Sequence, residues 1–234
     1  GDQFLPRELD KFIADFLFPA LSLSAPCLQI HDALWETITK FSVNRRYELY
    51  ALWEDAYYDD EKPIMLLARR GAEKKADVIA KRTTADAYSN DDIPMFLKYL
   101  RHACVRLGMT NPIQLFQALL NRVRQPNTDN LIAPYTKHLE TMPPLGIDVL
   151  VYCASSLQLA EKADQLARPE RMKILRNYAD FIGNLFKEHI SMDLQPLIAS
   201  VTSNLTRNPE AVDRIYIEKL LEHGAGMPLV KSMN

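Results

Sequence analysis

The sequence predicts an all-α protein built from a series of short-linked helices. Apolar residues recur every three or four positions along nearly the whole chain, which is typical of amphipathic helices. Strict alternation of apolar and polar residues between turn signals, which would indicate strands, is absent. Only seven of the 234 residues are glycine, too few to favour β-sandwiches or doubly wound sheets with phosphate-binding loops.

The first third of the chain contains the clearest apolar stripe, in which Leu9, Phe12, Ile13 and Phe16 share one helical face. The carboxylates of Asp59, Asp60 and Glu61 precede another apolar-periodic segment. Acidic groups stabilise the positive end of a helix, so we interpret them as a helix start rather than as catalytic carboxylates. The helices predicted here cover residues 7–23, 28–41, 44–58 and 62–87.

The middle third is divided by helix start and stop signals. Gly108 is predicted to be a left-handed C-cap, and Asn111 before Pro112 is predicted to cap the next helix. The run from Ile147 to Ala154 is apolar on almost every face except at Asp148, which predicts a central helix packed on both sides. The helices predicted here cover residues 92–107, 112–124, 129–142 and 146–160, the first starting after Asp91 and Asp92.

The last third has the same pattern. Asp193 before Leu194 and Asn208 before Pro209 are predicted helix starts, and Gly224 is a predicted C-cap. His189 and His223 fall at helix ends, where a partly charged imidazole interacts favourably with the helix dipole. The helices predicted here cover residues 169–190, 193–206 and 209–223.

The links between these eleven predicted helices are short, so consecutive helices are expected to form antiparallel hairpins. We predict that residues 1–234 form a single domain of degenerate hairpins stacked as a HEAT-like solenoid. A compact helical bundle is the alternative arrangement. In either case Leu100, Leu119, Leu150 and Val201 are expected to be buried between helices.

Composition gives little information about function but argues against secreted disulfide-rich proteins and membrane-spanning proteins. The net charge of −2 provides no bulk argument for nucleic acid or membrane binding. Cys27, Cys104 and Cys153 are not at motif spacing, so we expect buried thiols in a reducing compartment rather than a disulfide framework. No apolar run is long enough to span a bilayer, and no signal peptide is recognisable. Gly1 in place of an initiating Met suggests a piece of a longer protein.

The sequence contains no recognisable catalytic, cofactor-binding or metal-binding motif. The five histidines are never within four residues of each other or of a cysteine. We therefore predict a protein that is not an enzyme and that needs neither cofactor nor metal.

The strongest candidate for a functional surface is a basic helix. Residues 69–124 contain eleven Lys and Arg but only five Asp and Glu, within a chain that is otherwise acidic. One helical face is expected to carry Arg70, Lys74 and Lys81, flanked by Arg69, Lys75 and Arg82. Several cations on one face suit an acidic protein partner or RNA phosphates. The alternative is a solvated face that Glu73 and Asp77 partly neutralise.

Four aromatic residues, Tyr47, Tyr50, Trp53 and Tyr57, also share one helical face. Such a face could stack bases or bind a peptide. Aromatic side chains more often form packing seams between helices, with their hydroxyl groups reaching polar partners. The sequence favours the packing seam.

Four segments carry a resemblance to a known family. Residues 46–53 read RYELYALW and are followed by Tyr57 and Tyr58; they resemble the R-Y-x-L-Y-x-x-W…Y segment of the large second subunit of the THO complex. Residues 110–116 (TNPIQLF), 129–134 (DNLIAP) and 147–153 (IDVLVYC) resemble its S-N-P-x-x-L-F, D-N-L-I-x-P and Y-D-V-L-x-Y-C segments. Together these segments cover residues 45–155 in compatible order.

The resemblance implies a fragment from the middle of a long nuclear scaffold protein. THO is the core of the transcription–export (TREX) assembly, which acts in mRNA processing and mRNA transport. This region of the subunit is similar to the HEAT-type middle domain of the translation initiation scaffold factor 4G. Domains of that type contact DEAD-box ATPases, so the resemblance implies that the DEAD-box RNA-dependent ATPase of mRNA export and other THO subunits are partners. Direct RNA binding through the basic helix is the alternative; no membrane or small-molecule substrate is expected.

Overall fold

The computed structural model describes residues 7–83, 94–125, 128–156, 168–189 and 191–207, together with Glu218 and Glu222, and the regular elements within these ranges are all helical. This confirms the predicted all-α class. The elements are α1 (Arg7–Phe12), the π-helical turn η2 (Ile13–Leu17), α2 (Phe18–Leu23), α3 (Leu28–Ile38), α4 (Val43–Ala56), α5 (Pro63–Arg82), α6 (Pro94–Thr110), α7 (Pro112–Val123), the 3-10 turn η4 (Asp129–Leu131), α8 (Ile132–Leu139), α9 (Pro144–Ser156), α11 (Arg168–Glu188) and α12 (Gln195–Arg207). The predicted helix 209–223, the starts at Asp91 and Asn208, and the cap at Gly224 lie outside the described residues.

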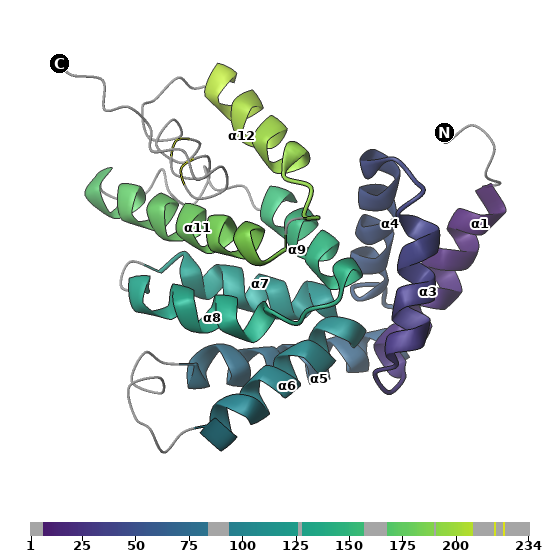
Figure 1. Cartoon of the computed structure of the whole chain (residues 1–234). Coiled ribbons are helices and arrows are strands. Elements are labelled where there is room, and N and C mark those ends of the chain that lie inside the picture. The colour runs from purple at the N-terminus through teal and green to yellow at the C-terminus, as the bar shows by residue number, and fades with distance from the viewer. Residues whose placement is uncertain are drawn as a thin grey trace.

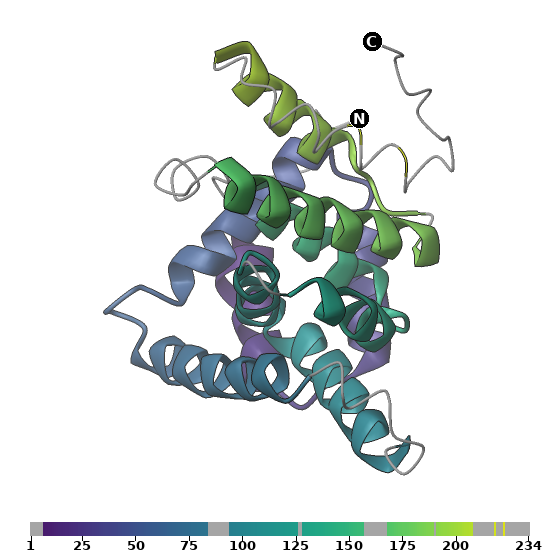
Figure 2. The ribbon, with the colours of Figure 1, turned by 90° about the vertical axis from the view of Figure 1, so that its left-hand side faces the viewer.

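The helices from α5 onward lie in two layers (Figure 1). In one layer α5 contacts α7, α7 contacts α9, and α9 contacts α12; in the other α6 contacts α8, and α8 contacts α11. Figure 2 shows the same order from the side, with α5 and α6 at one end of the stack. The N-terminal helices α1 to α4 lie beside these layers, where α2 contacts α5 and α6 and α4 contacts α9.

One hydrophobic cluster connects the described helices, from Ile13 in η2 to Leu197 in α12. Helix α9 lies at its centre, and all residues from Leu145 to Ala154 are buried. This confirms the helix predicted to be packed on both sides. Leu100, Leu119 and Leu150 are at most 1% exposed, as predicted, whereas the side chain of Val201 lies outside the described part.

The predicted helix over residues 7–23 is continuous but contains the π-helical turn η2. The backbone N–H of Phe18 donates to the Ile13 carbonyl oxygen, five residues back. Pro19 follows directly and has no N–H to donate, and its ring would crowd a carbonyl oxygen of the preceding helical turn. A π-turn at this point accommodates the proline without ending the helix.

Gly108 is not a C-cap, and that prediction is wrong, because α6 continues to Thr110. A Cβ atom at Gly108 would lie 2.5 Å from both Cε and Sδ of Met142, and one at Gly146 would lie 2.9 Å from the same Sδ. The two glycines therefore make room for Met142 between α6 and α9. The predicted cap at Asp193 is confirmed, because the Gln195 backbone N–H donates to its Oδ1 at 2.9 Å.

Candidate partner-binding site

The aromatic face of α4 lies in the core and not on the surface. Tyr50, Trp53 and Tyr57 have no exposed surface, and Trp53 stacks on Phe18 with ring centroids 4.3 Å apart. Tyr47 is half-buried and packs edge-to-face on Tyr152 at 5.4 Å. The predicted packing seam is confirmed, and these rings are not available for stacking on bases.

A buried hydrogen-bond network joins the end of α2 to α4 and to the start of α7. Trp53 Nε1 donates to Ser22 Oγ at 2.9 Å, and the Tyr57 hydroxyl donates to Asn111 Oδ1 at 2.9 Å. Asn111 Nδ2 donates to the Ser22 carbonyl oxygen at 3.3 Å. The prediction that the Asn111 amide caps α7 is wrong, since no side-chain cap bond forms there. A buried amide must satisfy both of its polar atoms, and these tertiary partners do so instead.

The six predicted binding residues, Arg69, Arg70, Lys74, Lys75, Lys81 and Arg82, all lie on α5. Five of them are exposed; Arg69 is half-buried, lies over the Tyr58 ring at 4.4 Å and approaches Glu73 at 3.4 Å. Lys81 Nζ pairs with Asp77 at 2.8 Å. Carboxylates of the same helix thus compensate two of the six cations, as the solvated-face alternative suggested.

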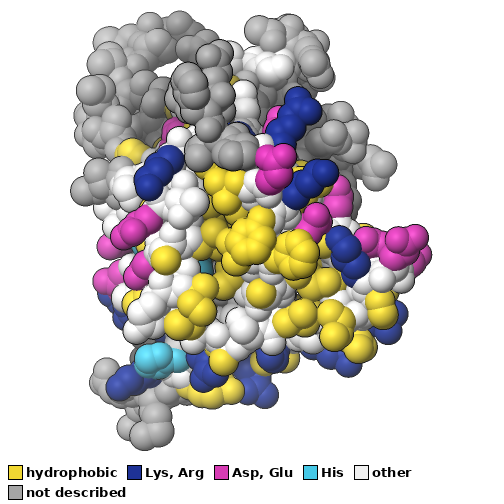
Figure 3. Space-filling view, turned by 90° about the vertical axis from the view of Figure 1, so that its right-hand side faces the viewer, with side chains coloured by type: hydrophobic (Ala, Val, Ile, Leu, Met, Phe, Trp, Pro, Cys, Tyr) yellow, Lys and Arg dark blue, Asp and Glu magenta, His cyan; other side chains and the backbone are white. Residues whose placement is uncertain are grey.

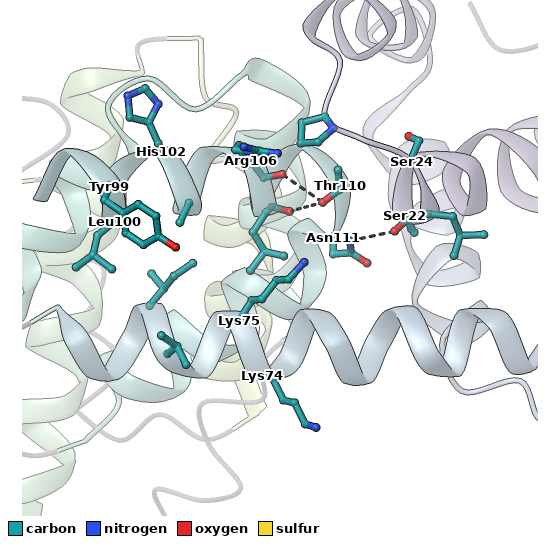
Figure 4. Close-up of a pocket in the computed structure, with 16 residues that line it drawn as sticks. Ser22, Ser24, Lys74, Lys75, Tyr99, Leu100, His102, Arg106, Thr110 and Asn111 are labelled. Carbon is teal, nitrogen blue, oxygen red and sulfur yellow. Dashed lines mark hydrogen bonds between the residues drawn. The ribbon is translucent and has the colours of Figure 1, made fainter. Parts of the chain in front are cut away.

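A groove of about 670 Å³ lies between α5, α6 and the end of α2. Figure 4 shows Lys75 extending across it towards Arg106 and Asn111, whereas the amine of Lys74 points away. Tyr99 and His102 lie further along α6. The lining residues are Ser22, Leu23, Ser24, Pro26, Lys74, Lys75, Val78, Ile79, Tyr99, Leu100, His102, Ala103, Arg106, Leu107, Thr110 and Asn111. The structure therefore places only two of the six predicted cations, Lys74 and Lys75, at this groove.

The groove is both basic and apolar. Lys74, Lys75 and Arg106 are exposed cations, and none of the residues that line it is Asp or Glu. Leu23, Val78 and Tyr99 expose 50%, 46% and 65% of their surface. Neither Arg106 nor His102 was predicted from the sequence to belong to a site. Their only signal was membership of the basic region 69–124, because the predicted pairing of consecutive helices does not indicate which residues of α6 face α5.

A second apolar surface lies on the N-terminal helices. Phe12 and Phe16 are 49% and 65% exposed and stack on each other with centroids 5.9 Å apart. Leu28 and Ile30 of α3 expose 51% and 54%. Figure 3 views the side of the molecule where α1 and α3 lie, and hydrophobic side chains gather over its centre. Contiguous exposed apolar surface of this kind is characteristic of protein–protein contacts.

The described residues contain no group of three or more His, Cys, Asp or Glu side chains that could hold a metal ion. His31 and His138 are buried, and burial lowers the pKa of each to about 4, so both are neutral at pH 7. His189, predicted to interact with a helix end, donates from Nε2 to the Leu139 carbonyl oxygen at 2.9 Å. Burial raises the pKa of Cys104 to about 12, which keeps this thiol protonated.

The thiols of Cys27, Cys104 and Cys153 are free; the latter two are buried, as predicted, and Cys27 is half-buried. Asp59 accepts a hydrogen bond from the backbone N–H of Glu61 at 2.9 Å within the turn that precedes α5. The capping role predicted for this acidic run is not confirmed, because Lys62 is the N-cap of α5, no side-chain cap bond forms there, and the first turn of the helix has no acidic residue. Within the described ranges, no helix has the length and apolarity required to cross a bilayer.

Two comparisons with known proteins place the chain. Residues 7–91 match the family described as THO complex subunit 2 N-terminus. The chain is also 22% identical over 228 residues to THO complex subunit 2 of Arabidopsis thaliana. That similarity covers 96% of this chain and 12% of the relative, so the chain spans about an eighth of the relative's length. Both findings confirm the resemblance to this subunit. The family match covers the first of the four sequence segments and extends the resemblance to the N-terminal side of residue 45.

Proposed function

Taking as premise the similarity to THO complex subunit 2 over 96% of the chain, we propose that this protein is a non-catalytic scaffold module of the nuclear THO complex. That similarity is the observation that carries the proposal. In this role the chain contributes to mRNA processing and mRNA export within the TREX assembly, and it acts by binding other proteins. The module corresponds to one part of a longer subunit, since the chain spans about an eighth of the relative's length.

The architecture that we propose for the module is a HEAT-like solenoid formed by residues 1–234, similar to the middle domain of the initiation scaffold factor 4G. The two layers of successively contacting helices support this proposal, since stacked helical hairpins produce such layers. Extended stacks of this kind offer long surfaces to partners rather than one enclosed active site.

We assign two classes of protein partner to the module, the neighbouring THO subunits and the DEAD-box RNA-dependent ATPase of mRNA export. The exposed apolar surface of α1, η2 and α3, which includes Phe12 and Phe16, suits a permanent contact with a neighbouring subunit. The exposed cations of α5 suit a more transient contact with an acidic surface, because such charges mainly steer encounter.

A pull-down of the purified chain with the export ATPase and with the other THO subunits tests this proposal. We expect retention of both partner classes, and Phe12→Ser/Phe16→Ser should selectively reduce retention of the subunits. The matched control is Leu67→Ser, at a 64% exposed leucine of α5. Failure of the chain to retain any of these partners, both alone and in the assembled complex, overturns the proposal.

The second candidate function is direct RNA binding, which the exposed cations of α5 favour. Phosphate contacts release counterions, so such binding weakens steeply as salt rises. Fluorescence anisotropy with single-stranded RNA at low and at moderate salt measures this directly. If no RNA binds, or if the affinity does not depend on salt, direct RNA binding is rejected and the scaffold proposal is unaffected.

A further inference from the structure

The groove between α5, α6 and the end of α2 combines exposed apolar side chains with exposed cations. Leu23, Val78 and Tyr99 are large apolar side chains, each about half exposed or more, and they lie around one hollow. Lys75 and Arg106 face that hollow from opposite helices, as Figure 4 shows. Exposed apolar surface in a concave site carries an energetic cost in water that a bound partner removes.

We propose that this groove binds an acidic amphipathic segment of a protein partner, with its apolar side chains against α6 and its carboxylates facing Lys75 and Arg106. The inference rests on the proposed function, because it specifies one surface of a protein-binding scaffold. The occupant follows from complementarity: the residues that line the groove include cations but no Asp or Glu. A helix seated in a groove between two helices presents apolar residues at the spacing that such a groove accepts.

The composition of the lining favours a peptide over RNA. A site for single strands needs several exposed aromatic rings on which successive bases stack, whereas this groove is lined by Tyr99 and the imidazole of His102 but by no Phe or Trp. Its walls consist instead of aliphatic side chains such as Val78, Leu100 and Leu107. Aliphatic walls contribute most when they cover leucine-like side chains of a partner.

The inner end of the groove is structurally fixed before any partner binds. Asn111 and Ser22 line it, and both are held by the buried network with Tyr57 and Trp53. Leu100 and Leu107 are at most 5% exposed and belong to packed helices. A preformed floor reduces the ordering cost of association, so a short segment is sufficient for measurable affinity.

The test uses the purified 234-residue chain and a fluorescein-labelled helical peptide of about 15 residues, with Leu at i, i+4 and i+7 and Glu at flanking positions. A matched peptide has Gln in place of Glu, and an oligouridine of similar length serves as the RNA probe. The test variants are Lys75→Glu/Arg106→Glu and Tyr99→Ala. The control variant, Lys40→Glu/Lys187→Glu, has the same change in charge at two exposed lysines that do not line the groove.

We expect the Glu peptide to bind, the Gln peptide to bind more weakly, and Lys75→Glu/Arg106→Glu to reduce affinity about tenfold or more. Tyr99→Ala should reduce affinity at unchanged salt dependence, and the control variant should stay within about twofold of the unsubstituted chain. The inference is overturned if the Glu and Gln peptides bind equally, if the groove and control variants behave alike, or if oligouridine binds at the groove in preference to the Glu peptide.

The same variants in the pull-down distinguish this inference from the proposed function. Retention of THO subunits by a chain that does not bind the Glu peptide overturns the groove assignment while the scaffold proposal stands. The opposite outcome is also informative. If the groove substitutions abolish peptide binding but the unsubstituted chain retains no THO partner, the groove assignment is supported and the proposed place of the chain in the THO complex is overturned.

Discussion

Arg46 and Asp148 form a buried ion pair that joins α4 to α9 across 102 positions of sequence. Arg46 Nε lies 2.8 Å from Asp148 Oδ2, and Nη2 lies 3.2 Å from Oδ1. The Tyr50 hydroxyl donates to the same Oδ2 at 2.7 Å, and Arg46 Nη1 donates to the Phe41 carbonyl oxygen at 3.0 Å. Two of the segments that carry the family resemblance are thus bound to each other in the core.

Burial opposes the charge of Arg46, but the hydrogen bond and the negative charge of Asp148 outweigh it, so the pKa of Arg46 is raised. Removing the carboxylate leaves a buried cation without its counter-charge. We expect Asp148→Asn to lower the free energy of unfolding by about 3–5 kcal/mol. The matched control is Asp10→Asn, which breaks the more exposed Arg45–Asp10 pair and should cost at most about 1 kcal/mol. Equal effects of the two substitutions in urea unfolding would contradict the structural role of the Arg46–Asp148 pair.

Leu150 tests the central position of α9. It has no exposed surface, so Leu150→Ala should cost about 2–5 kcal/mol through lost transfer energy and a residual cavity. Leu67→Ala on α5, where the leucine is 64% exposed, should change stability by only about 0.5 kcal/mol. Urea unfolding of both variants measures the difference. An unchanged melting temperature for Leu150→Ala would show that α9 is not central.

Gly108 and Gly71 are both helical glycines but have different surroundings. A Cβ at Gly71 meets nothing within 4 Å, so Gly71→Ala should stabilise the protein by about 0.5–1 kcal/mol. At Gly108 the new methyl group meets Met142, and overpacking should offset this gain by about 1–3 kcal/mol. In a Met142→Ala background, Gly108→Ala should become neutral or stabilising. Thermal unfolding of Gly71→Ala, Gly108→Ala, Met142→Ala and the Gly108→Ala/Met142→Ala double variant measures these effects. If the effects of the substitutions at positions 108 and 142 are additive, the contact between the two residues is refuted.

The buried histidines predict loss of stability in mild acid. Their pKa values are about 4 in the folded state against 6.5 when unfolded, so the unfolded chain binds more protons between these values. Stability is therefore lost as pH falls from about 6.5 to 4, by about 2 kcal/mol per histidine between pH 7 and pH 5. His31→Gln and His138→Gln should each reduce the difference in unfolding free energy measured at these two pH values. If the change in unfolding free energy between pH 7 and pH 5 is the same in both variants and in the unsubstituted chain, the buried histidines do not cause the loss of stability.

The predicted cationic face of α5 should affect partner association without affecting the stability of the fold. We expect Arg70→Glu/Lys74→Glu/Lys81→Glu to slow association with the acidic partner and to weaken its salt dependence. Stability should change little, because these side chains are exposed and the Lys81–Asp77 pair lies on the surface. Stopped-flow association and thermal unfolding provide the two readouts. If association is unchanged and the variant is folded, these residues form a solvated face that does not take part in binding.

The positions of most helices follow from sequence because the causes are local. Apolar periodicity predicts α4 and α7 to within a few residues, and Pro112 places the start of α7, since a proline at the first helical position loses no hydrogen bond. The same reasoning failed at Gly108 and Asn111. Each of the two was interpreted from its neighbours in sequence as a cap. What each of them does is determined instead by a distant residue outside the helices, Met142 between α8 and α9 for Gly108 and Tyr57 just after α4 for Asn111.

The basic charge of α5 was evident from the sequence, because side chains seven residues apart on a helix share a face wherever that helix lies. The groove was not evident from the sequence, because it forms only where α6 and the end of α2 lie against α5 and Arg106 and Lys75 line the same hollow. Likewise, the sequence alone determined that Asp148 interrupts an apolar helix, but not that Arg46 is its partner. Periodicity describes one helix at a time, whereas a groove and a buried ion pair depend on how several helices pack, and only the tertiary structure decides that packing.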